Sequence, residues 1–146
     1  MRWIADTNIL LRSVEVSHPT HSDTVTATQL LLSRGDLIHV TPQNLVEFWN
    51  VATRPVDRNG LGMTIPQVRA ELMQIKGLFG LLHDTPAIYP EWERLVIRHA
   101  VRGKNVHDAR IVAAMNVHRI TQLLTFNGDD FKRFQTITIV SPAEVK

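Results

Sequence analysis

Three acidic residues that lie far apart along the chain, Asp6, Glu47 and Asp108, have types and surroundings suited to chemistry. Asp6 follows an apolar segment at 1–5 and precedes a second apolar run that begins at Ile9. A carboxylate between a buried strand and a helix lies at the carboxyl edge of a sheet, where open α/β folds bind ligands. Glu47 and Asp108 lie in apolar helical segments, where an unpaired charge is costly. Together the three acids indicate a site for a divalent metal ion.

Only the folded chain can bring these acids together, because long stretches of sequence separate them. Clustered carboxylates raise one another's pKa unless a cation neutralises them. Oxygen ligands without a His or Cys cluster favour Mg²⁺ or Mn²⁺ over zinc. Each acid also has a simpler interpretation. Asp6 could cap a helix, Glu47 could face solvent, and Asp108 could occupy a first helical turn because the helix dipole favours it there.

The elements that must position the acids alternate between strands and helices. We expect strands at 2–6, 36–41, 120–126 and 136–140, with a short extended segment at 85–89. Helices are expected at 8–13, after a loop or helix entry at 18–22 as far as about 33, at 42–54, 64–82, 90–103 and 107–119, with one helical turn at 131–134. This alternation predicts an α/β fold in which a parallel sheet of four or five strands is covered by helices on both faces.

A chain of 146 residues with 44% hydrophobic and 21% charged residues has the size and composition of one globular domain, spanning 1–146. It contains no cysteine, which excludes disulfides and thiolate-bound zinc. No apolar run approaches the ~20 residues that a membrane helix requires. The first residues lack the pattern of a secretory signal, because Asp6 interrupts the apolar stretch. We therefore expect a cytoplasmic protein that does not associate with membranes.

Basic residues gather in one part of the sequence, although the net charge of +2 is small. Arg94, Arg98 and Arg102 are spaced four residues apart, so on a helix they would form one basic stripe, and Lys104 follows. A solvated helix face is the simpler interpretation of such a stripe. Beside an acidic metal site, the same residues become candidates for contact with the phosphates of RNA.

Four motifs in this order resemble the PIN-domain nucleases, and within them the VapC-type ribonuclease toxins. The resemblance covers essentially the whole chain and is carried by the segments Ala5–Leu11, the helix around Glu47, Val106–Ala109 with Ala113, and Leu123–Phe131. It implies a PIN-like, Rossmann-like fold in which Asp6, Glu47 and Asp108 hold the metal.

The resemblance also implies supporting residues. Thr7 corresponds to the small hydroxyl residue that orients the first acid, with Asn8 as further support of the site. The family's fourth acidic position is Asn127 here, whose amide oxygen could bind a metal or a metal-bound water. Asp129, two residues further on, could take its place, and Asp130 is interpreted as a cap of the following turn.

The function implied is metal-assisted hydrolysis of phosphodiester bonds in single-stranded or structured RNA, by the toxin of a type II toxin–antitoxin pair. Mg²⁺ is the expected cofactor, with Mn²⁺ as an alternative. An antitoxin protein is the expected partner. A homodimer is also expected, and the apolar segment 61–82 could serve either as an interface or as ordinary core.

Two other classes of function stay open at this point. A PIN-like module that binds RNA or protein with weak or no catalysis is favoured by Asn127, which lacks the acid. A phosphotransfer protein with Asp6 as nucleophile would require a second acid at position 8 or a well-placed lysine. Asn8 occupies the first place, and Lys132 is the only weak candidate for the second.

Overall fold

Five parallel strands form a single sheet in the computed structural model, which describes residues 1–146. Their spatial order is β3-β2-β1-β4-β5. The strand order reverses beside β1, so the sheet has its topological switch point between β1 and β4. The α/β fold with a parallel sheet is therefore confirmed. The strands are β1 Arg2–Ala5, β2 Leu37–Val40, β3 Gly80–Leu81, β4 Gln122–Leu124 and β5 Thr138–Val140.

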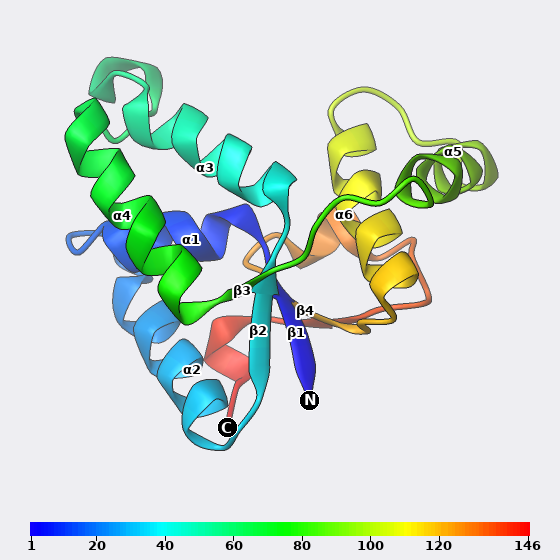
Figure 1. The fold of residues 1–146 in the computed structure, drawn as a ribbon, viewed down its shortest axis with the longest axis horizontal. Coiled ribbons are helices and arrows are strands. Elements are labelled where there is room, and N and C mark those ends of the chain that lie inside the picture. The colour runs from blue at the N-terminus through cyan, green and yellow to red at the C-terminus, as the bar shows by residue number, and fades with distance from the viewer.

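Helices cover both faces of the sheet (Figure 1). One face is covered by α1 Thr7–Val14, α2 His21–Ser33, α3 Pro42–Thr53 and α4 Ile65–Leu78. The other face is covered by α5 Ile88–Arg98 and α6 Asn105–His118. Three short 3₁₀ helices complete the chain, η1 Val56–Arg58, η2 Gly128–Phe131 and η3 Pro142–Glu144. No helix is both long and apolar enough to cross a bilayer.

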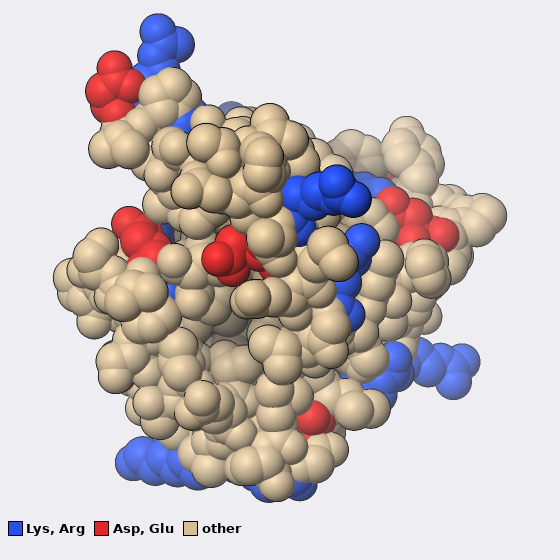
Figure 2. All heavy atoms as spheres, turned by 60° about the vertical axis from the view of Figure 1, so that its left-hand side comes forward, with Lys and Arg blue, Asp and Glu red and all other residues tan.

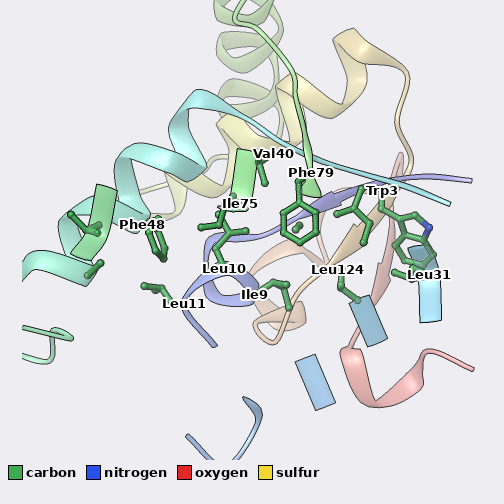
Figure 3. Packing of buried hydrophobic residues seen from close by; sticks show 14 residues of the cluster. Trp3, Ile9, Leu10, Leu11, Leu31, Val40, Phe48, Ile75, Phe79 and Leu124 are labelled. Atoms are coloured by element: carbon green, nitrogen blue, oxygen red, sulfur yellow. The ribbon is translucent and has the colours of Figure 1, made fainter. Parts of the chain in front are cut away.

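Each face of the sheet has its own hydrophobic core, because successive side chains of a strand point to opposite faces. Trp3 and Ala5 of β1 pack with α1 to α4, whereas Ile4 packs with α5 and α6. In the first of these cores, Phe79 lies near Val40 and Ile75, while Phe48 of α3 is fully buried further along (Figure 3). The two cores fix α3 and α6 on opposite sides of the sheet.

The start of α3 follows from its local sequence. Pro42 occupies its first turn, where a missing N–H costs nothing. The Thr41 side chain accepts from the backbone N–H of Asn44, and the Asn44 side chain accepts from the backbone N–H of Thr41. This reciprocal cap satisfies two donors that the helix would leave free. It also fixes the residue at which α3 begins, and therefore which position of the helix Glu47 occupies.

The predicted helix at 64–82 is too long at its C-terminal end. The structure ends α4 at Leu78, and the extended Phe79 buries its ring in the core with 4% exposure. The chain then forms the edge strand β3, whose next residue Leu82 donates to the carbonyl of Val40 at 2.8 Å. The fifth strand therefore lies at 80–81 rather than in the predicted extended segment 85–89, whose last two residues belong to α5.

The predicted helix at 90–103 also ends earlier, at Arg98. Ala100 adopts a left-handed conformation with φ 49°, and the N–H of Val101 donates to the carbonyl of Val96 at 3.0 Å. This geometry is the Schellman ending of a helix, which usually has glycine at the left-handed position. The predicted turn at 131–134 lies three residues earlier in the structure, at Gly128–Phe131.

Candidate active site

Asp6 lies at the switch point of the sheet, directly after β1. Its backbone N–H donates to the carbonyl of Leu124 in β4 at 3.0 Å, and its side chain is buried, with 8% of the residue exposed. One carboxylate oxygen accepts from the N–H of Thr7 at 2.8 Å and so caps α1. The other accepts from the Thr125 hydroxyl at 2.7 Å and from the Asn8 amide at 3.3 Å. The capping interpretation of Asp6 is correct, and the buried carboxylate still lies at the ligand-binding edge.

Glu47 reaches the same edge from α3 and is half-buried rather than solvent-facing. Its two carboxylate oxygens are held by different donors. The Thr7 hydroxyl donates to Oε2 at 2.6 Å, and the Gln43 amide donates to Oε1 at 2.9 Å. Thr7 in turn accepts from the Asn44 amide at 3.2 Å. Thr7 therefore links the start of α1 to Glu47, as a residue that orients the site would.

Asp108 lies in the first turn of α6 and is half-buried. Burial raises its pKa to about 7, and the negative charges of Asp6, Asp130 and Glu47 add to the rise. Lys104 is the one opposing influence that lowers it. The side chain stands close enough to the other acids to feel their charge, although it comes from the opposite face of the sheet.

The pKa of Asp6 is raised for the same reasons. Burial is the largest cause, and the charges of Glu47 and Asp130 add to it. The hydrogen bonds from Thr125 and from the N–H of Thr7 act in the opposite direction, since they favour the ionised carboxylate. The fold therefore brings the three acids predicted from the sequence into one electrostatic group, and a fourth acid joins them.

That fourth acid is Asp130, for which the sequence predicts a capping role. Its charge raises the pKa of both Asp6 and Asp108. Asp129 instead is exposed and forms an ion pair with Lys132, which lowers the pKa of its carboxyl. Lys132 pairs with Asp129 and is not among the groups that shift the pKa of Asp6, so the phosphotransfer interpretation gains no support. Adjacent positions of the short turn η2 face different ways, and no sequence rule gives the direction of each.

Asn127 lies at the rim of the site. Its side chain is exposed, and its backbone N–H donates to the Thr125 hydroxyl at 3.0 Å. Asn127, Asp130 and Thr125 line one cavity of about 510 Å³, which Lys132 and Ser141 also line. Asn127 therefore lines an open, polar space together with Asp130, whereas Asp6, Glu47 and Asp108 are not among the residues that line it.

The donor set has the chemistry that a divalent cation requires, but it is not a closed coordination shell. No group of three Asp, Glu, His or Cys side chains stands in an arrangement that would hold a metal ion. Four carboxylates nevertheless share this edge, and only Lys104 opposes their charge at Asp108. Hard oxygen donors with uncompensated negative charge suit Mg²⁺ or Mn²⁺. Binding would require a rotation of carboxylate side chains toward one another.

The basic residues do not form the stripe that their spacing predicts. Arg102 lies beyond the end of α5, so it does not continue the helix face of Arg94 and Arg98. Arg94 is ion-paired with Glu91 at 2.7 Å, whereas Arg98, Arg102 and Lys104 are exposed without ion pairs. Of this group, only Lys104 influences the candidate acids.

Comparison with known proteins places this chain in a family. The family model for the PIN domain matches residues 4–136, which is most of the chain. The protein therefore belongs to the PIN domain family, and the resemblance drawn from the sequence is confirmed. No curated protein matches the sequence.

Solved structures share the fold at low sequence identity. VapBC2 from Rickettsia felis, bound to a DNA fragment from its promoter, has a TM-score of 0.70 at 15% identity, covering 97% of this chain and 98% of the other. VapBC-1 from nontypeable Haemophilus influenzae has a TM-score of 0.71 at 15% identity with the same coverage. VapC20 from Mycobacterium tuberculosis, described as a sarcin-ricin loop cleaving toxin, has a TM-score of 0.65 at 17% identity, covering 90% and 95%.

Proposed function

We propose that the protein is a metal-dependent endoribonuclease that hydrolyses phosphodiester bonds in single-stranded or structured RNA. The observation that supports this most directly is the group of acids at the switch point of a PIN fold, where Asp6 and Asp108 have raised pKa values. Uncompensated carboxylates at a ligand-binding edge are what a divalent cation would neutralise. No serine, cysteine or histidine nucleophile is required.

The residues proposed to hold the metal are Asp6, Glu47 and Asp108, with Asp130 as the fourth acid and Asn127 at the rim. Mg²⁺ is the proposed cofactor, and Mn²⁺ has the same ligand preference. When bound, such a cation lowers the pKa of a coordinated water and stabilises negative charge on the phosphate.

The protein's own side chains orient and ionise the acids. Thr125 and Asn8 hold one oxygen of Asp6, and Thr7 holds one oxygen of Glu47. These donors orient the carboxylates at this edge of the sheet before the substrate arrives. Asp108 must lose its proton to take part, and its pKa of about 7 places that step near neutral pH.

RNA is proposed to approach along the exposed basic residues near the N-terminus of α6. Lys104 stands near Asp108, Arg102 lies on the connection that precedes it, and Arg98 is the last residue of α5. Arg94 contributes less, because Glu91 engages its guanidinium. Phosphate contacts of this kind supply affinity without reading sequence.

We assign the protein to a type II toxin–antitoxin pair, located in the cytoplasm, with an antitoxin as its partner. Support comes from the neighbours that are themselves VapBC complexes. The side of the molecule where α1 to α4 lie is largely uncharged on its visible surface (Figure 2). A cavity of about 250 Å³ opens there between α1, α2 and α4, lined by Val14, Leu32, Leu78 and other residues.

A homodimer is part of the same proposal. The segment 61–82 is divided in the structure: Val68, Ile75 and Phe79 belong to the core, whereas Ile65 and Met73 are exposed. The exposed apolar side chains are the part left available for a partner. Light scattering of the purified protein, compared with a Met73→Asp variant, would measure whether the dimer forms through this surface.

The test of the enzymatic proposal is cleavage of a labelled RNA by the purified protein with Mn²⁺, with Mg²⁺ and with EDTA. Wild-type protein is expected to cleave only with a divalent cation. Asp6→Asn is expected to lose cleavage while it stays folded and binds RNA. Equal absence of metal-dependent cleavage in both proteins would contradict the proposal and favour the alternative, a PIN-like module that binds RNA or protein without cutting it. Asn127 and the open arrangement of the acids are the features that favour that alternative.

A further inference from the structure

The side chain of Gln43 connects two parts of the site that belong to opposite faces of the sheet. Glu47 lies on α3, which packs in the core of Trp3 and Ala5, and Asp108 lies on α6, which packs in the other core. The side-chain hydrogen bonds that join α3 to α6 all involve Gln43. The relative placement of Glu47 and Asp108 therefore depends on the sheet and on this one side chain.

All the polar atoms of the Gln43 amide are engaged. Its nitrogen donates to Glu47 Oε1 at 2.9 Å and to the carbonyl of His107 at 2.8 Å, and its oxygen accepts from Arg110 Nη1 at 3.2 Å. A glutamine amide has two N–H donors and one carbonyl, so a single orientation satisfies these partners. The reversed orientation would place the amide oxygen against two acceptors and leave Arg110 facing donors.

Arg110 selects this orientation together with Glu47 and the carbonyl of His107. A guanidinium can only donate, so its contact with Gln43 requires the amide oxygen on that side. Arg110 is itself held by Asp84, with Nη2 and Oδ1 3.2 Å apart. It belongs by sequence to the basic stretch near α6, but its donors point to Gln43 and Asp84. Its guanidinium is therefore held by contacts within the protein.

We propose that Gln43 is a positioning residue for Glu47 and that Arg110 acts through Gln43 by fixing the direction of its amide. This inference rests on the proposed function, because it concerns an acid of the same site. Gln43 ties Glu47 to the backbone at His107, the residue before Asp108. It thereby holds two like-charged side chains at a set separation while it carries no charge itself.

The test compares Gln43→Met, Gln43→Glu and Arg110→Met with two controls. Met matches the length of Gln without its donors, and Glu keeps the shape but replaces the donors with a charge beside Glu47. The controls are Gln74→Met and Arg69→Met on α4, because both wild-type residues are exposed and neither side chain forms a hydrogen bond.

Loss of a residue that orients a metal ligand typically costs about 10- to 100-fold in metal affinity or activity. We expect a fall of that size in kcat and in Mn²⁺ affinity for the Gln43 variants and for Arg110→Met. KM for RNA and its salt dependence should stay unchanged in these variants. The control variants Gln74→Met and Arg69→Met should keep the wild-type kcat, Mn²⁺ affinity and KM. The double variant Gln43→Met with Arg110→Met should be no worse than Gln43→Met alone, since Arg110 acts through Gln43.

Three results would overturn the inference. The first is an unchanged kcat in Gln43→Met, and the second is additive loss in the double variant. The third is a raised KM with a flatter salt dependence in Arg110→Met, because that would identify Arg110 as a phosphate contact.

A second measurement separates this inference from the proposed function. In metal-free protein, the side-chain amide protons of Gln43 should give NMR signals displaced from those of an exposed glutamine, and Arg110→Met should move them. Signals at the positions of a free glutamine would overturn the positioning role by themselves. Displaced signals in a wild-type protein that cleaves no RNA would support the hydrogen-bonded role of Gln43 between α3 and α6. They would contradict only the proposed nuclease function.

Discussion

The hydroxyl of Thr125 donates to Oδ2 of Asp6 at 2.7 Å and so joins the residues that follow β4 and β1 across the switch point of the sheet. Thr125 is 1% exposed, and its oxygen also accepts from the Asn8 amide at 3.3 Å and from the N–H of Asn127 at 3.0 Å. One buried hydroxyl therefore fixes the first acid and the loop that carries the rim of the site. The strength of that connection can be measured.

Thr125→Val keeps the shape of the side chain but leaves Asp6, Asn8 and the N–H of Asn127 without this partner. Unsatisfied buried groups cost about 1–3 kcal/mol, so the free energy of unfolding should fall by that amount. Urea denaturation measures the change. Thr125→Ser keeps the hydroxyl and should retain most of the stability. A valine variant as stable as the wild type would show that the hydrogen bond contributes nothing.

The pKa of Asp108 predicts how stability depends on pH. The carboxyl titrates near 3.8 when unperturbed and at about 7 in the folded chain. Between these values the folded chain binds the proton more tightly than the unfolded chain does. The contribution of Asp108 to stability should therefore fall as pH rises from about 4 to about 7, and the deficit should persist at higher pH.

Asp108→Asn removes this titration. The variant should have a higher Tm than the wild type above about pH 7, and the gain should shrink as pH approaches about 4. Thermal denaturation across this range measures the difference. Mn²⁺ should stabilise the wild type more at the alkaline end, because protons compete with the metal for the carboxylate. Parallel pH profiles for the two proteins would contradict the raised pKa.

Asp130 and Asp129 form a matched pair, because the two acids are adjacent but only Asp130 influences Asp6 and Asp108. Asp130→Asn should weaken Mn²⁺-dependent cleavage by at least about tenfold, in the range found when groups around a metal site are removed. Asp129→Asn should leave cleavage near the wild-type rate, since it removes only an exposed ion pair with Lys132. Cleavage assays on the two variants show which of the two aspartates acts at the site. The reverse order of effects would assign the fourth position to Asp129.

Arg98 and Arg102 are exposed, so their replacement tests the proposed RNA path without disturbing the core. Arg98→Gln with Arg102→Gln should weaken RNA binding and reduce the salt slope by about 0.7 for each phosphate that the variant no longer neutralises. Arg69→Gln with Lys76→Gln makes the same change of charge on α4 and serves as the control. Equal slopes in the two double variants would mean that only net charge, not position, matters.

Much of the fold could be predicted from local sequence because particular residue types favour helix caps and turns. Gly35 ends α2 with φ 89°, as its position after the last helical residues predicts. Thr41 and Pro42 begin α3 where a cap and a first-turn proline would place it. The ends of α4 and α5 were predicted wrongly. Phe79 leaves its helix to bury its ring, so tertiary packing decides the end of α4. Ala100 takes a left-handed conformation more usual for glycine, so its residue type does not indicate the end of α5.

For the candidate site too, some residues could be recognised from the sequence and others could not. Asp6, Glu47 and Asp108 could be selected from the sequence because charge in apolar surroundings is costly unless it has a role. Asp130 was missed because the direction of a side chain in a short turn depends on the packing of its buried neighbour Phe131. Gln43 was missed because its role exists only through Arg110 and His107, which the fold brings beside it.

The most direct test of the proposed metal site is the position of Mn²⁺ in crystals of the protein, located by anomalous scattering. One peak or more is expected at roughly 2.0–2.3 Å from oxygens of Asp6 and Asp108, with the carboxylates rotated inward from their metal-free positions. Diffraction that shows no manganese at this edge, at a Mn²⁺ concentration that supports cleavage, would contradict the claim that these acids hold the catalytic metal.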